Sequence, residues 1–183
     1  MANNSIGLIE LSSVAAGYQA ADTMLKAADT ELILSRSICS GKYMVMVRGD
    51  VSSVEASVKA GISIGDFSVI DSFVIPNVHE SIFPAISGTT KVEELEALGI
   101  IEAFSVASLI EGADAAVKSA NVRLIEIRLA MALGGKAFVT LTGDVAAVQN
   151  AVEVGAKLIG QKGLLVNFVV IPRPRRELTS DMI

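Results

Sequence analysis

The feature that most constrains this fold is an internal repeat. The stretch IGLIELSSVA, beginning at Ile6, recurs as LGIIEAFSVA beginning at Leu98, and the same alignment places Lys26 on Lys118. Farther along, GDVSSVEASVKAG recurs as GDVAAVQNAVEVG, and FVIP recurs as VVIP. Self-similarity of this extent indicates two copies of one folding unit. The chain is therefore expected to fold as two similar domains, which we place at residues 1–92 and 93–183.

Each copy carries the same predicted order of strands and helices. Alternation of apolar and polar residues indicates strands, and apolar residues spaced three or four apart indicate helices. The fold class is accordingly α+β, a tandem duplication of a βαββαβ domain. In the first copy the pattern predicts a strand over Ile6–Leu11, a helix over Val14–Ala28, strands over Glu31–Ile38 and Tyr43–Arg48, a helix over Val51–Ile64 and a strand over Phe67–Ile75.

Several polar residues are candidates for chemistry, and each has a simpler structural interpretation. Asp50 and Asp144 could be metal ligands or acids, but a carboxylate directly before a helix is typical of an N-cap. Lys26 and Lys118 could be catalytic, yet nothing near them in sequence supplies a substrate pocket, so a solvated helix face is expected. His79, the sole histidine, lacks a second ligand at metal-binding spacing, which favours a surface or packing role. We find no phosphate-binding, nucleophile or zinc-hydrolase motif and expect no enzyme.

Charge and hydropathy argue against two classes of partner. The net charge is -5, and no basic cluster is longer than RPRR near the C-terminus, which argues against nucleic acid. Mean hydropathy is high, +0.56, but polar residues interrupt every apolar run well short of the roughly 20 residues of a membrane-spanning helix. The start of the chain lacks the basic and apolar regions of a secretory signal. We therefore expect a soluble cytosolic protein that buries its surplus apolar surface between subunits.

Cys39, the only cysteine, lies between two predicted strands in the stretch ICSGK. A single thiol cannot form a disulfide within its own chain, and metal or iron-sulfur sites usually take several thiolates. Any metal chemistry at Cys39 thus needs sulfurs from other copies of the protein. Without them, a lone buried cysteine is more often a small hydrophobic residue.

These stretches resemble the tandem-domain, trimeric class of bacterial microcompartment shell proteins, over essentially the whole chain. ADTMLKAA and ADAAVKSANV are similar to the first helix of that family with its edge lysine, RGDVSSVEASVKAG to its second strand and helix, and VIPRP to its closing strand. The stretches ICSGK in the first copy and GGK in the second make the chain most similar to the T-type class of propanediol-utilisation shells. Members of that class carry proline after the cysteine, where this chain has Ser40.

The resemblance implies a four-stranded antiparallel sheet flanked by helices in each domain, and a pseudohexagonal homotrimer. In this family the loop between the second and third strands lines a central pore, and Ile38, Cys39, Ser40 and Gly41 fall on that loop. Three Cys39 thiolates would then meet at one axis. The resemblance implies that they hold one [4Fe-4S] cluster per homotrimer, for electron transfer across the shell.

The resemblance also implies where the protein works and with what. It places the chain in the shell of a cytoplasmic bacterial microcompartment, with itself, other shell proteins and an encapsulated or cytosolic redox protein as partners. Lys26, Lys118 and Arg173 correspond to residues that pack at the edges between neighbouring tiles, and Asn77 stands in place of Arg173 in the first copy.

Two alternative functions stay open on the residues themselves. The first is a shell trimer whose pore passes small metabolites while Cys39 is an unligated thiol. The second belongs to another class, a small-ligand regulatory module, since βαββαβ repeats also build such sensors. The residues likewise do not separate a [4Fe-4S] cluster from a smaller cluster or zinc, because thiolates suit all three.

Overall fold

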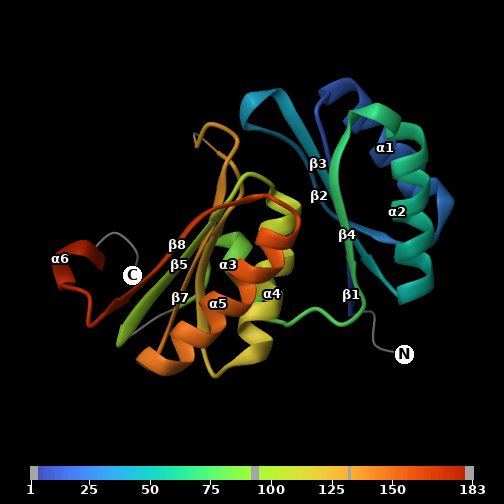
Figure 1. Ribbon diagram of the computed structural model, residues 1–183. Coiled ribbons are helices and arrows are strands. Elements are labelled where there is room, and N and C mark those ends of the chain that lie inside the picture. Colours follow the sequence, from blue (N-terminus) through green and yellow to red (C-terminus); the bar gives the residue numbers. More distant parts are fainter. Residues whose placement is uncertain (1–3, 92–94, 132, 180–183) are drawn as a thin grey trace. The chain divides into compact units, whose positions relative to one another are not determined.

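The computed structural model describes residues 4–91, 95–131 and 133–179 of the chain. The chain divides into two compact units, the first within Met1–Val78 plus Met131–Gly135 and the second within His79–Ala130 plus Lys136–Ile183 (Figure 1). Both units have the βαββαβ order, so the predicted duplication is confirmed. The predicted domain boundary, between positions 92 and 93, lies outside the described residues.

The first unit contains one antiparallel sheet with the strand order β2-β3-β1-β4. All six predicted elements are present, with one notable difference in bounds. The last strand begins at Val69 rather than Phe67, because Asp66–Ser68 forms a 3-10 turn in which Asp66 has a φ of 45°. The elements are β1 (Ser5–Leu11), α1 (Val14–Ala27), β2 (Glu31–Ile38), β3 (Lys42–Gly49), α2 (Val51–Gly65) and β4 (Val69–Ile75).

The second unit repeats this architecture with the strand order β6-β7-β5-β8. The short helix α3 (Ile82–Ser87) precedes this sheet in the chain and packs along β6. Another short helix, α6 (Arg176–Thr179), follows the last strand. The repeated elements are β5 (Ala97–Ala103), α4 (Val106–Ser119), β6 (Arg123–Arg128), β7 (Ala137–Gly143), α5 (Val145–Gln161) and β8 (Leu165–Pro172).

In each unit the two long helices lie on the same side of the sheet (Figure 1). In the first unit, Ile9 and Leu11 point toward these helices and form a core with Met24 of α1 and Val54 of α2. Successive residues of a strand point to opposite faces, so Leu8 points away from the helices. Leu8 is nevertheless fully buried. The first sheet therefore buries apolar side chains on both of its faces.

Each long helix begins at a capping side chain. The hydroxyls of Ser13 and Ser105 cap α1 and α4, and the carboxylates of Asp50 and Asp144 cap α2 and α5. Each side chain accepts a hydrogen bond from a first-turn amide that has no partner within the helix. The predicted N-cap role of the two aspartates is confirmed. In the part of the chain that the structure describes, no helix is both long enough and apolar enough to cross a membrane.

The two aspartate caps differ in their surroundings, which gives a prediction on pH dependence. Asp50 accepts hydrogen bonds from the hydroxyls of Ser52 and Ser53, both at 2.7 Å, and from the Ser53 amide at 2.9 Å. These bonds, that of Ser52 foremost, hold the pKa of Asp50 well below its usual range. Because the folded-state pKa is lowered, the ionised cap contributes fully above the unfolded-state pKa of about 3.9. That contribution is lost only as the pH falls through the lower folded-state pKa.

Replacing Ser52 and Ser53 by alanine reproduces the second copy, where Ala146 and Ala147 stand at these positions. We expect the pKa of Asp50 to rise toward the ordinary range of aspartate, because both hydroxyl donors are lost. Carbon-13 NMR titration of the Asp50 carboxyl measures this change. An unchanged titration curve would show that the hydroxyls are not the cause.

Candidate functional site

Cys39 lies in a tight connection between β2 and β3. The two strands pair as far as Ile38 and Lys42, so the 3-10 turn Cys39–Gly41 is the whole connection. Within it, Ser40 has φ and ψ of 65° and 27°, and Gly41 has a φ of 71°. Two consecutive left-handed residues reverse the chain sharply, which places the half-buried Cys39 at the end of the hairpin. We call residues 39–41 the cysteine loop.

Ser40 adopts a backbone conformation that few residues other than glycine tolerate. A positive φ brings the side chain close to the backbone and costs about 1–2 kcal/mol. Proline is restricted to a φ near −65°, so a proline at position 40 could not adopt the conformation seen here. The cysteine loop of this chain therefore has a shape that depends on Ser40. At Gly41 an added Cβ would meet nothing within 4 Å, so its positive φ, rather than crowding, favours glycine.

An ion pair that the sequence analysis did not single out lies at the base of the cysteine loop. The ammonium of Lys42 donates to Oε1 of Glu10 at 2.8 Å, and the side chains are 18% and 0% exposed. Glu10 lies opposite Met44 in the β1–β3 register, and Lys42 lies two residues before Met44 in β3. Residues two apart in a strand point to the same face, so Glu10 and Lys42 are diagonal neighbours on one sheet face. That face is the one directed away from the helices.

The second copy has the same pair, with Lys136 and Glu102 at 2.7 Å, but there the side chains are 39% and 31% exposed. The signal for these residues was present in the sequence, because both the glutamate and the lysine occur at equivalent positions of the repeat. What the sequence did not show was the cross-strand register that joins them.

The equivalent loop of the second copy is longer and differently shaped. It connects Arg128, the last residue of β6, to Ala137, the first of β7. Left-handed φ values occur at Ala130 (45°), Gly134 (60°) and Gly135 (88°). The extra residues of the second copy predicted this difference. Position 132 of this loop lies outside the described residues.

The two predicted edge lysines lie in the last turns of α1 and α4, and each forms an ion pair one helical turn back. Lys26 pairs with Asp22 at 2.6 Å, and Lys118 pairs with Asp114 at 2.5 Å. The first pair is exposed to solvent, whereas Asp114 is buried. These positions agree with charged ends of surface helices, and their role at a tile edge stays a prediction.

His79 and Arg173 belong to the second unit, and the backbone amide of each donates a hydrogen bond within it. The His79 amide donates to Oδ1 of Asp114 at 2.8 Å, and its imidazole Nδ1 is 2.8 Å from the Ser81 hydroxyl. These contacts fit the predicted packing role. The Arg173 amide donates to the carbonyl of Glu96 at 2.8 Å, and its φ is 47°. The exposed Arg173 side chain therefore follows a sharp turn directly after β8.

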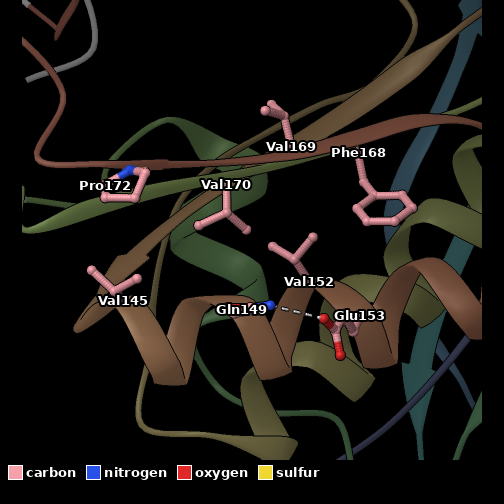
Figure 2. A pocket seen from close by; sticks show the side chains of 8 residues that line it. All are labelled: Val145, Gln149, Val152, Glu153, Phe168, Val169, Val170 and Pro172. Carbon is pink, nitrogen blue, oxygen red and sulfur yellow. Dashed lines mark hydrogen bonds between the residues drawn. The ribbon is translucent and has the colours of Figure 1, made fainter.

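An open groove of about 420 Å³ lies between α5 and β8 (Figure 2). Phe168 and Val169 line it and are 45% and 42% exposed. Its polar residues, Gln149 and Glu153, hydrogen-bond to each other at 3.3 Å along α5. The groove therefore offers an apolar contact surface and no arrangement of catalytic groups. Its full lining is Val145, Gln149, Val152, Glu153, Phe168, Val169, Val170 and Pro172.

Equivalent surfaces of the two copies differ strongly in exposure. Val14, Tyr18 and Leu25 form one stripe along α1, since they are separated by four and seven residues. They are 38%, 66% and 40% exposed. The equivalent stripe of α4 is covered, because its residues Val106, Ile110 and Val117 are 0%, 0% and 7% exposed.

The sheets show the opposite asymmetry. On the sheet face directed away from the helices, Phe73 of the first unit is 4% exposed, and its counterpart Val169 in the second unit is 42% exposed. Each copy thus leaves uncovered the apolar surface that its counterpart buries. Sequence reasoning missed this contrast because both members of each pair are apolar.

Comparison with known proteins places this fold among microcompartment proteins. The model of the BMC domain matches residues 5–78 and again 97–174. The chain is 44% identical to the bacterial microcompartment shell protein PduT of Citrobacter freundii, over 99% of this chain and 98% of that protein. It is 42% identical to the shell protein EutM of Salmonella typhimurium, over 46% of this chain and 85% of that protein. A crystal structure of a microcompartments protein from Desulfitobacterium hafniense DCB superposes with a TM-score of 0.86 at 50% identity, covering 96% and 98% of the two chains.

The left-handed conformation of Ser40 leads to a paired prediction. Ser40→Gly is expected to keep the loop and to change the free energy of unfolding by about 1 kcal/mol or less, because strain relief is offset by unfolded-state entropy. Ser40→Pro is expected to lower it by more than about 1 kcal/mol and to reshape the cysteine loop. Urea unfolding and amide NMR shifts of residues 38–42 measure both effects. Equal stability of the two variants would contradict the observed loop conformation.

Proposed function

This chain belongs to the BMC-domain family of bacterial microcompartment shell proteins, and from this premise we propose that it forms a pseudohexagonal homotrimer whose three Cys39 thiolates hold one [4Fe-4S] cluster at the central axis. The match to the BMC domain and to a shell protein confirms the family resemblance that the sequence indicated. The relatives are structural shell proteins, so this protein is a shell protein and not an enzyme. Family membership also favours a shell protein over a small-ligand regulatory module.

The exposure asymmetry of the two copies carries the proposal of a ring. The first copy exposes an apolar stripe on α1, and the second copy exposes an apolar sheet face around Val169. The equivalent surface of the other copy is buried in each case, so the two exposed surfaces suit contact with each other. If α1 of one chain contacts the second sheet of the next chain, both exposed apolar surfaces become covered. Such a head-to-tail contact closes into a ring when the rotation permits.

The number of domains sets the number of chains. The EutM relative aligns with about half of this chain, so one chain corresponds to two single-domain proteins. Single-domain members of the family form hexagonal tiles, as the resemblance implies. Three chains supply six domains, and the ring is then a homotrimer with alternating first and second copies. Its threefold axis brings three equivalent cysteine loops together.

The donor set fits an iron-sulfur cluster only across subunits. Among residues 4–91, 95–131 and 133–179, no group of three His, Cys, Asp or Glu side chains is arranged to hold a metal ion. One thiolate from each of three chains provides three soft ligands, the type that iron-sulfur clusters take. Cys39 sits at the end of a hairpin, where it can approach the corresponding residue of another chain.

Each residue of the cysteine loop has a role in this arrangement. Cys39 is the ligand, and Ser40 and Gly41 turn the chain so that the backbone can approach the axis closely. The amides of Ser40, Gly41 and Lys42 are the donors nearest in sequence to the ligand sulfur, and hydrogen bonds to such sulfurs tune a cluster. When bound, the cluster supplies one-electron transfer across the shell, which requires a redox protein as partner. Lys26, Lys118 and Arg173 are the proposed contacts to neighbouring tiles.

The ring predicts the effect of a charge on the α1 stripe. Leu25→Glu is expected to weaken association by about tenfold or more, because the charge would be buried without a partner. Ala27→Glu adds the same charge in the same helical turn but away from the stripe, and we expect it to leave the trimer intact. Sedimentation velocity of both variants measures the change, with circular dichroism as the control for folding. If the Leu25→Glu and Ala27→Glu variants form trimers with equal affinity, the subunit interface does not include the α1 stripe.

The cluster predicts a dependence on Cys39 alone. After anaerobic reconstitution, wild-type protein is expected to hold about four irons and four sulfides per trimer. Cys39→Ala is expected to lose the iron and sulfide while remaining trimeric, because the substitution lies outside the apolar subunit surfaces. Iron and sulfide assays with electron paramagnetic resonance after reduction measure this. Intact wild-type trimers without iron would favour a plain metabolite pore with an unligated thiol. Wild-type trimers that hold zinc instead of iron would show that the three thiolates bind a different metal.

A further inference from the structure

The buried ion pair at the base of the cysteine loop has no role in the proposal so far. We infer that Glu10 and Lys42 are positioning residues for Cys39, which fix the base of its loop and set the electrostatic potential at its sulfur. The inference rests on the proposed function only in giving Cys39 its purpose as a ligand. It concerns the loop itself, so it can be tested with or without a bound cluster.

The geometry leaves the loop little freedom at its base. Only Cys39, Ser40 and Gly41 lie between the last paired residues, Ile38 and Lys42. Ile38 is buried, and the Lys42 ammonium is held 2.8 Å from a carboxylate oxygen of Glu10 in the next strand. Both ends of the loop are therefore anchored, one by apolar packing and the other by an ion pair.

The burial of the pair makes its charges matter at the loop. Charges in contact with water are screened within about 8–10 Å, whereas buried charges are screened much less. The Glu10 side chain is fully buried and the Lys42 side chain is 18% exposed, so removal of either charge changes the net charge near the cysteine loop by one unit of known sign. Glu10→Gln leaves the positive charge of Lys42, and Lys42→Gln leaves the negative charge of Glu10. The two variants must then shift the potential at Cys39 in opposite directions.

Alkylation of the apoprotein reads this potential directly. Iodoacetate is an anion and iodoacetamide is neutral, and both react with the same thiolate. The ratio of their rate constants therefore cancels differences in thiol ionisation and reports the charge around the sulfur. Because Cys39 is the only cysteine, the modified residue is unambiguous. The assay uses the full chain at low ionic strength without added iron.

We expect Glu10→Gln to raise the iodoacetate to iodoacetamide ratio about threefold and Lys42→Gln to lower it by a similar factor, from the interaction of unit charges near a protein surface. The double variant, which removes both charges, is expected to return near the wild-type ratio. It also keeps the test decisive if Lys42→Gln, which removes the ammonium from beside a buried carboxylate, fails to fold. Unfolding midpoints of each variant report structural damage separately.

The chain offers a matched control in the same hairpin. Glu31 and Arg48 form an ion pair at 2.7 Å, and they pair in register at the opposite end of β2 and β3 from Ile38 and Lys42. That end is roughly 23 Å away at the rise of a β-strand, beyond the screening length. Glu31→Gln removes the same charge and is expected to leave the ratio unchanged.

The outcomes separate this inference from the proposed function. Unchanged ratios in folded Glu10→Gln and Lys42→Gln would overturn it, and shifts of the same sign would show loosening of the loop rather than an electrostatic role. If the wild type never binds iron, the proposed function fails while the alkylation ratios still decide the inference. Where the cluster forms, its reduction potential is expected to rise in Glu10→Gln and fall in Lys42→Gln, because positive charge favours the reduced state.

Discussion

The structure depends on one constraint: each sheet carries apolar side chains on both faces, and the two long helices of a domain cover only one of them. In the first unit the second face is buried around Leu8 and Phe73. In the second unit the same face remains partly exposed at Val169. The first unit has a different exposed apolar surface, the stripe on α1. Exposed apolar residues on a shell protein suit contact with other subunits, so we expect these surfaces to be covered in an assembly.

The proposed metal site at the cysteine loop requires that assembly. One thiol per chain is a weak metal site, and the described residues bring no second sulfur to it. In the proposed threefold ring, each chain contributes one copy of this loop. The tight turn at Ser40 and Gly41 and the ion pair at Lys42 would then act on three equivalent sulfurs at the proposed axis.

The sequence predicted the elements well and the relations between elements poorly. Apolar periodicity and the repeat were enough to predict the βαββαβ order, and the aspartates before α2 and α5 predicted their own caps. The Glu10–Lys42 pair depends on the register of β1 against β3, which local patterns do not encode. The left-handed Ser40 could not be expected either, because serine rarely adopts a positive φ. The contrast between Tyr18 and Ile110 depends on surroundings, since both side chains suit a buried helix face.

The measurement that tests the account most directly is the distance between Cys39 residues of different chains. A nitroxide label on this single cysteine in the apoprotein reports it by pulsed dipolar spectroscopy, and partial labelling isolates pairs of spins. A threefold ring with the cysteine loops at its axis predicts one narrow distribution at short distance, with a three-spin contribution at full labelling. Several distances, long distances or no dipolar coupling would contradict the convergence of the three thiols and with it the proposed site.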